Sequence, residues 1–226
     1  MIFSSIEFLV FFLIFLILIK FFPNNQRIVI ILSSLFFYGY WNPYFLILII
    51  YFLIITYLFL KKNTDLKISI PVILLPLFYF KYSLFIAKLI DINFLIDIAY
   101  SSELPLAISF VTFTIIALLI DVKNKKYSGE TNFTNISEFL IYFPQLIAGP
   151  ILRAKELIPE LKKKIIFSNS NIKFGIFLFT VGFVKKIFFA DSIASFIDPI
   201  FESPDIAEGK DVIKAYLLFP LQIYFD

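Results

Sequence analysis

The chain has 226 residues, of which 60% are hydrophobic and 16% are charged, and its formal net charge is +3. Soluble domains contain about 45–50% apolar and about 25% charged residues, so this composition excludes an ordinary soluble fold and predicts a protein embedded in lipid. Cysteine and histidine are both absent. Their absence excludes disulfides, a cysteine nucleophile and a zinc site with thiolate or imidazole ligands, so we expect no metal site.

Apolar stretches follow one another along the chain and predict an all-α polytopic membrane protein with about seven or eight membrane segments. The stretches are residues 2–22, 28–40, 44–60, 68–90, 104–120, 139–152, 172–190 and 212–226. A helix needs about 20 apolar residues to cross the hydrocarbon core, so two stretches are too short to cross upright. Residues 28–60 are expected to form a hairpin. Residues 139–152 are expected to be a re-entrant element, because Pro144 and the Gly149-Pro150 pair break the helix.

Basic and acidic residues gather in different connections between the apolar stretches, and this distribution predicts the orientation of the chain in the membrane. Lysine and arginine gather in residues 20–27, 61–67, 123–126 and 153–173, whereas residues 91–103 and 191–211 are mainly acidic. The positive-inside rule places basic connections in the cytoplasm and therefore the N-terminus outside. The last apolar stretch reaches Asp226 without a polar stop, so we expect the chain to be incomplete at its C-terminus.

Residues 142–153 (YFPQLIAGPILR) form the most informative run of the chain. Gln145 lies at membrane depth, where a polar side chain needs a partner, and Arg153 ends the run. Both are candidates for lining a tunnel or binding an acyl donor. The structural alternative is a kinked helix followed by an arginine that anchors it at the cytoplasmic surface, and composition favours neither.

Residues 182–191 (GFVKKIFFAD) place Lys185 and Lys186 in an apolar helix, where a charge is costly unless it reaches water or a cavity. Asp191 follows these lysines at five and six residues. An ion pair at the helical spacing of i and i+4 is therefore not expected. The alternative to a functional role is an amphipathic stretch at the membrane interface.

Residues 222–226 (QIYFD) end the chain with two polar side chains in apolar surroundings. Gln222 and Asp226 are four residues apart, so they share one face of a helix. We expect this face to point to a cavity or to a partner helix. A polar contact between packed helices is the structural alternative.

Several runs, taken in order, resemble the membrane-bound O-acyltransferase family, in the branch of the alginate and peptidoglycan O-acetylation membrane subunits. The runs are residues 1–5 (MIFSS), 36–41 (FFYGYW), 104–110 (LPLAISF), 143–153, 183–191 and 222–226, with Asp121 and Val122 after the third. Ala107 stands where the family usually has glycine. The resemblance covers almost the whole chain.

The resemblance implies that residues 1–226 are the N-terminal part of one membrane acyltransferase domain. The family's Phe-Ser-Gly-Tyr-Ser-Asp stretch, its Trp-His motif and its catalytic histidine would come later in the chain. No catalytic residue is therefore assigned here. We expect the chain alone to be inactive, as the product of a truncated reading frame or as one half of a split protein.

The implied activity is the transfer of an acyl group, expected to be acetyl, across the cell membrane to an extracytoplasmic polysaccharide. Acetyl-CoA is the expected cytoplasmic donor, without a bound cofactor, and residues 153–173 would suit its phosphates. The expected partners are the lipid bilayer, the polysaccharide and a separate extracytoplasmic acyltransferase. Lys162–Lys164 is more simply a membrane-surface anchor than a nucleic-acid site, so no nucleic acid is expected. The alternative is a non-catalytic membrane scaffold or partner subunit.

Overall fold

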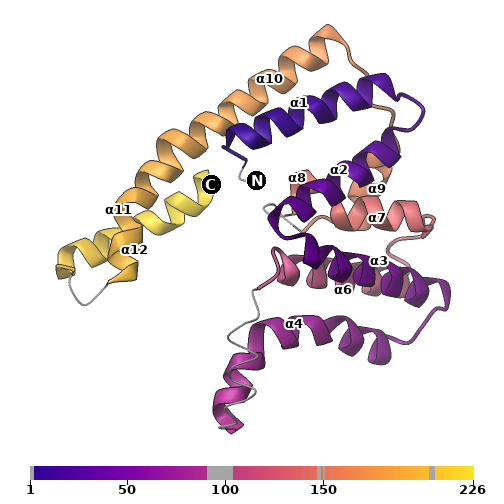
Figure 1. Ribbon diagram of the computed structural model, residues 1–226, viewed down its shortest axis with the longest axis horizontal. Coiled ribbons are helices and arrows are strands. Elements are labelled where there is room, and N and C mark those ends of the chain that lie inside the picture. Colours follow the sequence, from indigo (N-terminus) through magenta and orange to yellow (C-terminus); the bar gives the residue numbers. More distant parts are fainter. Residues whose placement is uncertain (1–2, 91–103, 147–148, 150, 204–206) are drawn as a thin grey trace. The chain divides into compact units, whose positions relative to one another are not determined.

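The computed structural model describes residues 3–90, 104–146, 149, 151–203 and 207–226, and every regular element within them is a helix (Figure 1). The prediction of an all-α fold is confirmed for this part of the chain. The described chain divides into two compact units. The first comprises Ile14–Ile165, and the second comprises Ile2–Leu13 and Ile166–Asp226.

The first unit contains the second half of α1 and all the helices from α2 to α9. They are α1 (Ile6–Phe21), α2 (Gln26–Trp41), a 3-10 turn (Pro43–Phe45), α3 (Leu46–Lys61), α4 (Leu66–Ile90), α6 (Ile108–Lys123), α7 (Phe133–Ile141), α8 (Phe143–Leu146) and α9 (Ala154–Lys162). The predicted hairpin of residues 28–60 corresponds to α2 and α3, and the 3-10 turn joins them. That turn forms because Pro43 fixes the backbone and the Asn42 side chain accepts a hydrogen bond from the Tyr44 N–H.

The short helix α7 lies at the centre of the first unit, because it contacts α2, α3, α6, α8 and α9. Residues 135–141 are all buried. The helix begins at Phe133, six residues before the predicted stretch, since Asn132 caps it by accepting a hydrogen bond from the Asn135 N–H at 2.9 Å. The predicted start of this segment at residue 139 was therefore wrong.

The predicted break in residues 139–152 is present and follows from proline. Helix α7 ends at Ile141, and α8 follows with Pro144 in its first turn, where the missing N–H breaks no hydrogen bond. Gly149 has φ of +152°, a conformation that favours glycine. The broken segment packs against protein, since Phe143 and Leu146 are buried. A re-entrant path through a membrane stays a prediction.

Helix α6 begins at Ile108, so the predicted start of this segment at residue 104 was wrong. Ala107 precedes it with φ of +56°, in the left-handed region. A left-handed residue cannot continue a right-handed helix, and Pro105 already interrupts the backbone hydrogen bonds. The family resemblance leads us to expect glycine at position 107, and a left-handed backbone there would favour it.

The second unit is a helical hairpin. It consists of α10 (Asn169–Val184), a π-helical turn (Lys185–Ala190), α11 (Asp191–Glu202) and α12 (Gly209–Phe225). Figure 1 shows α10 running through the π turn into α11, with α12 beside α11. The predicted end of this segment at residue 190 was wrong. The helix continues because Asp191–Glu202 has one apolar side, from which Ile197 is buried and Phe201 contacts Tyr216 and Phe219 of α12.

Exposed apolar surface supports a membrane location. Helix α10 buries none of its residues, and Phe174, Ile176 and Phe177 are more than 60% exposed. Such a surface would drive aggregation in water but is suited to lipid. In the part of the chain that is described, two helical stretches, Pro43–Lys61 and Leu66–Ser83, are long and apolar enough to cross a membrane. The predicted number of membrane segments and the orientation stay predictions.

Candidate functional site

Lys186 is the centre of a charged cluster in the second unit. Its Nζ lies 3.0 Å from Asp191 Oδ1 and also pairs with Asp226 Oδ1. The expectation that Lys186 and Asp191 would not pair was wrong, because it assumed a regular α-helix. The π turn is wider and forms i to i+5 hydrogen bonds, so residues five apart come together.

The cluster joins two segments that are far apart in sequence. Lys186 lies in the π turn and Asp191 directly follows it, whereas Asp226 comes from the end of α12. The aromatic rings of Phe189 and Phe225 stack beside the same junction, with centroids 4.9 Å apart. Two carboxylates thus share one ammonium group. The side chains are 30% (Lys186), 46% (Asp191) and 50% (Asp226) exposed, so the cluster remains open on one side.

Gln222 lies on the same face of α12 as Asp226, one turn earlier. Its backbone oxygen accepts a hydrogen bond from the Asp226 N–H at 2.9 Å. Its side-chain Oε1 is buried and has no hydrogen-bond partner among the described residues. Lys185 is exposed and forms no salt bridge in the described part of the chain, so it lies outside the cluster.

Arg153 belongs to the first unit and pairs with a residue that we had not assigned to the site. Its Nη1 lies 3.1 and 3.2 Å from the two carboxylate oxygens of Asp121. Asp121 is nearly buried at the end of α6, and Arg153 immediately precedes α9. The pair therefore joins two helices, while half of the arginine side chain stays exposed. The signal in the sequence was Asp121 itself, a carboxylate at the end of an apolar stretch.

Gln145 lies in α8, at the break that follows α7. Its backbone N–H donates to the Tyr142 carbonyl at 3.0 Å, and its side chain is half-buried. A Cβ atom at Gly149 would lie 3.5 Å from Gln145 Cγ, so the chain passes close to this side chain. Gln145 is placed in the first unit with Arg153, and the Lys186 cluster is in the second.

Sequence reasoning missed a buried ion pair between α2 and α7. Arg27 Nε donates to both carboxylate oxygens of Glu138 at 2.8 and 2.9 Å, and Nη2 donates to Asn135 Oδ1 at 2.6 Å. The Glu138 side chain is only 1% exposed. From the sequence, Arg27 was used only to predict the orientation of the chain in the membrane. The available signal was a single glutamate inside an apolar run, since a buried carboxylate requires a partner.

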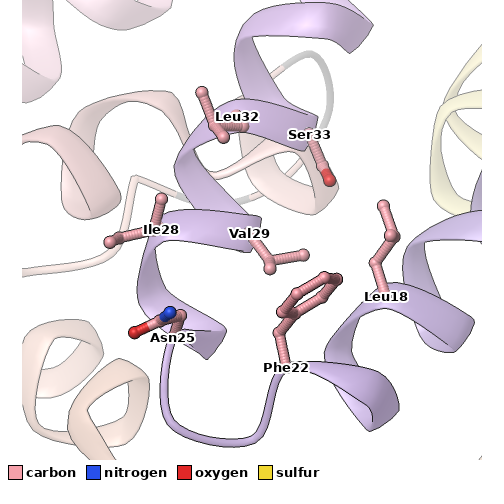
Figure 2. Close-up of a pocket in the computed structure, with 7 residues that line it drawn as sticks. All are labelled: Leu18, Phe22, Asn25, Ile28, Val29, Leu32 and Ser33. Atoms are coloured by element: carbon pink, nitrogen blue, oxygen red, sulfur yellow. The ribbon is translucent and has the colours of Figure 1, made fainter.

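A pocket of about 270 Å³ lies where α1 turns into α2 (Figure 2). Its lining is apolar except for two residues, and Figure 2 shows Phe22 and Val29 lying close to each other within it. It is lined by Leu18, Phe22, Asn25, Ile28, Val29, Leu32 and Ser33. None of the candidate site residues lines this pocket. Within the described residues, no three acidic side chains are grouped so that they could hold a metal ion.

Comparison with known proteins tests the family resemblance. The Probable alginate O-acetylase AlgI of Pseudomonas aeruginosa is 38% identical over 129 residues, which are 54% of this chain and 23% of that protein. The protein of the same name from Azotobacter vinelandii is 36% identical over 54% of this chain and 24% of its own length. The Peptidoglycan O-acetyltransferase of Helicobacter pylori is 37% identical over 54% of this chain and 28% of its own length.

The chain therefore spans about a quarter of the length of the curated relatives it matches. No family model and no solved structure matches it. The relatives nevertheless have two named acceptors, alginate and peptidoglycan, and one shared activity, O-acetyl transfer. They confirm that this chain resembles the membrane-bound O-acyltransferase family, in its alginate and peptidoglycan O-acetylation branch.

Proposed function

We propose that this chain supplies a membrane-embedded part of an O-acyltransferase that acetylates an extracytoplasmic polysaccharide. The observation that carries the proposal is the identity of 38% over 129 residues to an alginate O-acetylase. The helical fold and its exposed apolar surface agree with a membrane enzyme. The acceptor is a polysaccharide hydroxyl, reached directly or through a separate extracytoplasmic acyltransferase.

The donor in this proposal is acetyl-CoA, bound from the cytoplasm. Its phosphates would meet the basic segment that begins at Arg153 and includes Lys162–Lys164. Arg153 keeps half of its side chain exposed although it pairs with Asp121. Lys162 and Lys163 have acidic neighbours, Glu130 at 3.6 Å and Glu160 at 2.6 Å, whereas Lys164 forms no salt bridge among the described residues.

The donor assignment is tested by measuring the affinity of the purified chain for coenzyme A. Replacing Arg153 and Lys162–Lys164 by glutamine should weaken binding, because charge-assisted hydrogen bonds to phosphate are lost. The control replaces two lysines outside the basic segment, Lys210 and Lys214, which lie in the second unit and already pair with Glu208 and Asp211. Equal affinity of all variants would rule out the basic segment as the donor site.

The base of the reaction is expected to lie outside these 226 residues, since they contain no histidine and histidine is the usual group for activating a hydroxyl. The chain alone should therefore transfer no acetyl group. The absence of histidine also favours the alternative, in which the chain is a non-catalytic scaffold or partner subunit.

A chimera separates the two functions. In the Pseudomonas aeruginosa relative, the region that matches this chain is replaced by the matching residues of this chain. If this chain supplies part of an acyltransferase, cells that express the chimera should still secrete alginate that carries O-acetyl groups. Alginate without O-acetyl groups, from cells whose membranes hold the chimera at the parent's level, would contradict the proposal and favour the scaffold.

A further inference from the structure

Two helix ends in the first unit lie side by side and carry exposed lysines. Helix α3 contacts α6, and Lys123 Nζ, at the end of α6, donates to Asn63 Oδ1, just after α3, at 3.4 Å. The connections that follow the two helices are therefore neighbours. Their exposed lysines, here called the basic end, are Lys61, Lys62, Lys123, Lys125 and Lys126.

The charges of the basic end are not neutralised by carboxylates. Among the described residues, none of its lysines forms a salt bridge. Two acidic residues nearby in sequence pair with other cations, since Asp121 pairs with Arg153 and Glu130 pairs with Lys162. A helix C-terminus carries only about half a negative charge. Two helix C-termini together carry about one negative charge, whereas the basic end carries five lysines. Most of the positive charge of the basic end is therefore left unbalanced.

An aromatic contact indicates where the basic end meets the bilayer. Lys61 Nζ lies 5.6 Å from the centre of the Tyr57 ring, and that ring packs edge-on against Phe133 at 5.8 Å. The stretch Pro43–Lys61, which comprises the 3-10 turn and α3, is long and apolar enough to cross a membrane. A tyrosine and lysines at the end of such a helix are typical of the boundary between hydrocarbon and lipid headgroups.

We propose that the basic end binds the phosphate groups of anionic phospholipids in the surrounding leaflet. Basic residues between the ends of neighbouring membrane helices are suited to lipid headgroups with phosphate charges. The lysines come from two connections that a hydrogen bond holds together, so they present their charges as a group. The site uses residues other than those assigned to the acyl donor, and it does not depend on acyl transfer.

The test counts lipids bound to the purified full chain by native mass spectrometry, with phosphatidylglycerol or phosphatidylcholine added to the detergent. The unchanged chain should prefer phosphatidylglycerol. K62Q/K126Q removes one lysine from each connection and should weaken phosphatidylglycerol binding by roughly 25-fold, since each lysine near an anionic surface contributes about fivefold. K62R/K126R keeps both charges and should bind as the unchanged chain does.

K210Q/K214Q is the matched control, because it removes the same charge from the second unit, where both lysines have acidic partners. It should retain the preference for phosphatidylglycerol. Equal weakening in both glutamine variants, or no preference in the unchanged chain, would overturn the proposal. Displacement of the lipid by excess coenzyme A would also overturn it, since the site would then bind soluble phosphates.

Discussion

The charge balance around Lys186 depends on one cation between two carboxylates. Lys186→Met would leave Asp191 and Asp226 without their shared partner, so the free energy of unfolding in detergent micelles should fall by about 1 kcal/mol, the scale of partly exposed charged hydrogen bonds. Lys186→Arg keeps the positive charge and should preserve most of the free energy of unfolding. If the methionine variant unfolds at the same denaturant concentration as the unchanged chain, the cluster does not stabilise α12.

The backbone at Ala107 predicts a stabilising substitution. Its φ of +56° is unfavourable for alanine and free for glycine. Ala107→Gly should therefore raise the free energy of unfolding by roughly 1 kcal/mol, measured by denaturant titration. The control is Ala117→Gly inside α6, which should lower it by about as much. A loss of stability in both variants would show that Ala107 is not left-handed.

At the residue scale, the sequence identified most of the polar side chains but not their partners. Gln222 and Asp226 could be placed on one helix face from their spacing alone. Lys186 and Asp191 could not be paired, because an α-helical spacing was assumed and a π turn has no simple sequence pattern. Glu138 and Asp121 were not assigned to pairs, since their arginines lie 111 and 32 residues away.

Between elements, the pair of Arg27 and Glu138 fixes α2 to α7. Arg27→Ala would leave a carboxylate that is 1% exposed without its cation. The free energy of unfolding should fall by about 3 kcal/mol, since removing one partner of a buried pair leaves an uncompensated charge. The second change Glu138→Leu should restore part of the loss. A double variant as unstable as Arg27→Ala would show that packing, rather than charge, is responsible.

The π turn predicts an unusual tolerance to deletion. Removing Ile187 would convert the turn to regular α-helix and leave Lys186 and Asp191 at i and i+4, where an ion pair still forms. The deletion should retain the helical signal in circular dichroism and change the free energy of unfolding by less than about 1 kcal/mol. Deleting Phe177 from regular α10 is the control and should destabilise more. If the deletion of Ile187 lowers the free energy of unfolding more than the deletion of Phe177 does, this interpretation of the π turn is wrong.

At the element scale, the all-α class was predictable from apolar stretches alone, whereas the ends of helices were not. Asn132 starts α7 earlier than hydropathy indicates, and Ala107 starts α6 later. Both boundaries depend on local hydrogen bonds and dihedral angles to which a hydropathy pattern is insensitive. The continuation into α11 was missed because the acidic residues along this helix conceal its single buried side.

For the whole molecule, the basic and acidic connections are expected to lie on opposite sides of a membrane. The proposed donor site needs the basic connections on the cytoplasmic side, and the same arrangement decides which leaflet the proposed lipid site faces. The chain offers a direct way to test it. It contains no cysteine, so a single introduced cysteine is the only reactive thiol.

The measurement labels Ser128→Cys and Ser203→Cys in intact cells with a maleimide that does not cross membranes. Both serines are exposed, one in the basic connection after α6 and the other directly after α11. We predict that Ser203→Cys reacts in intact cells, whereas Ser128→Cys reacts only after the membrane is permeabilised. Labelling of Ser128→Cys from outside, with Ser203→Cys protected, would reverse the topology. Labelling of both in intact cells would contradict a chain that spans the membrane between them.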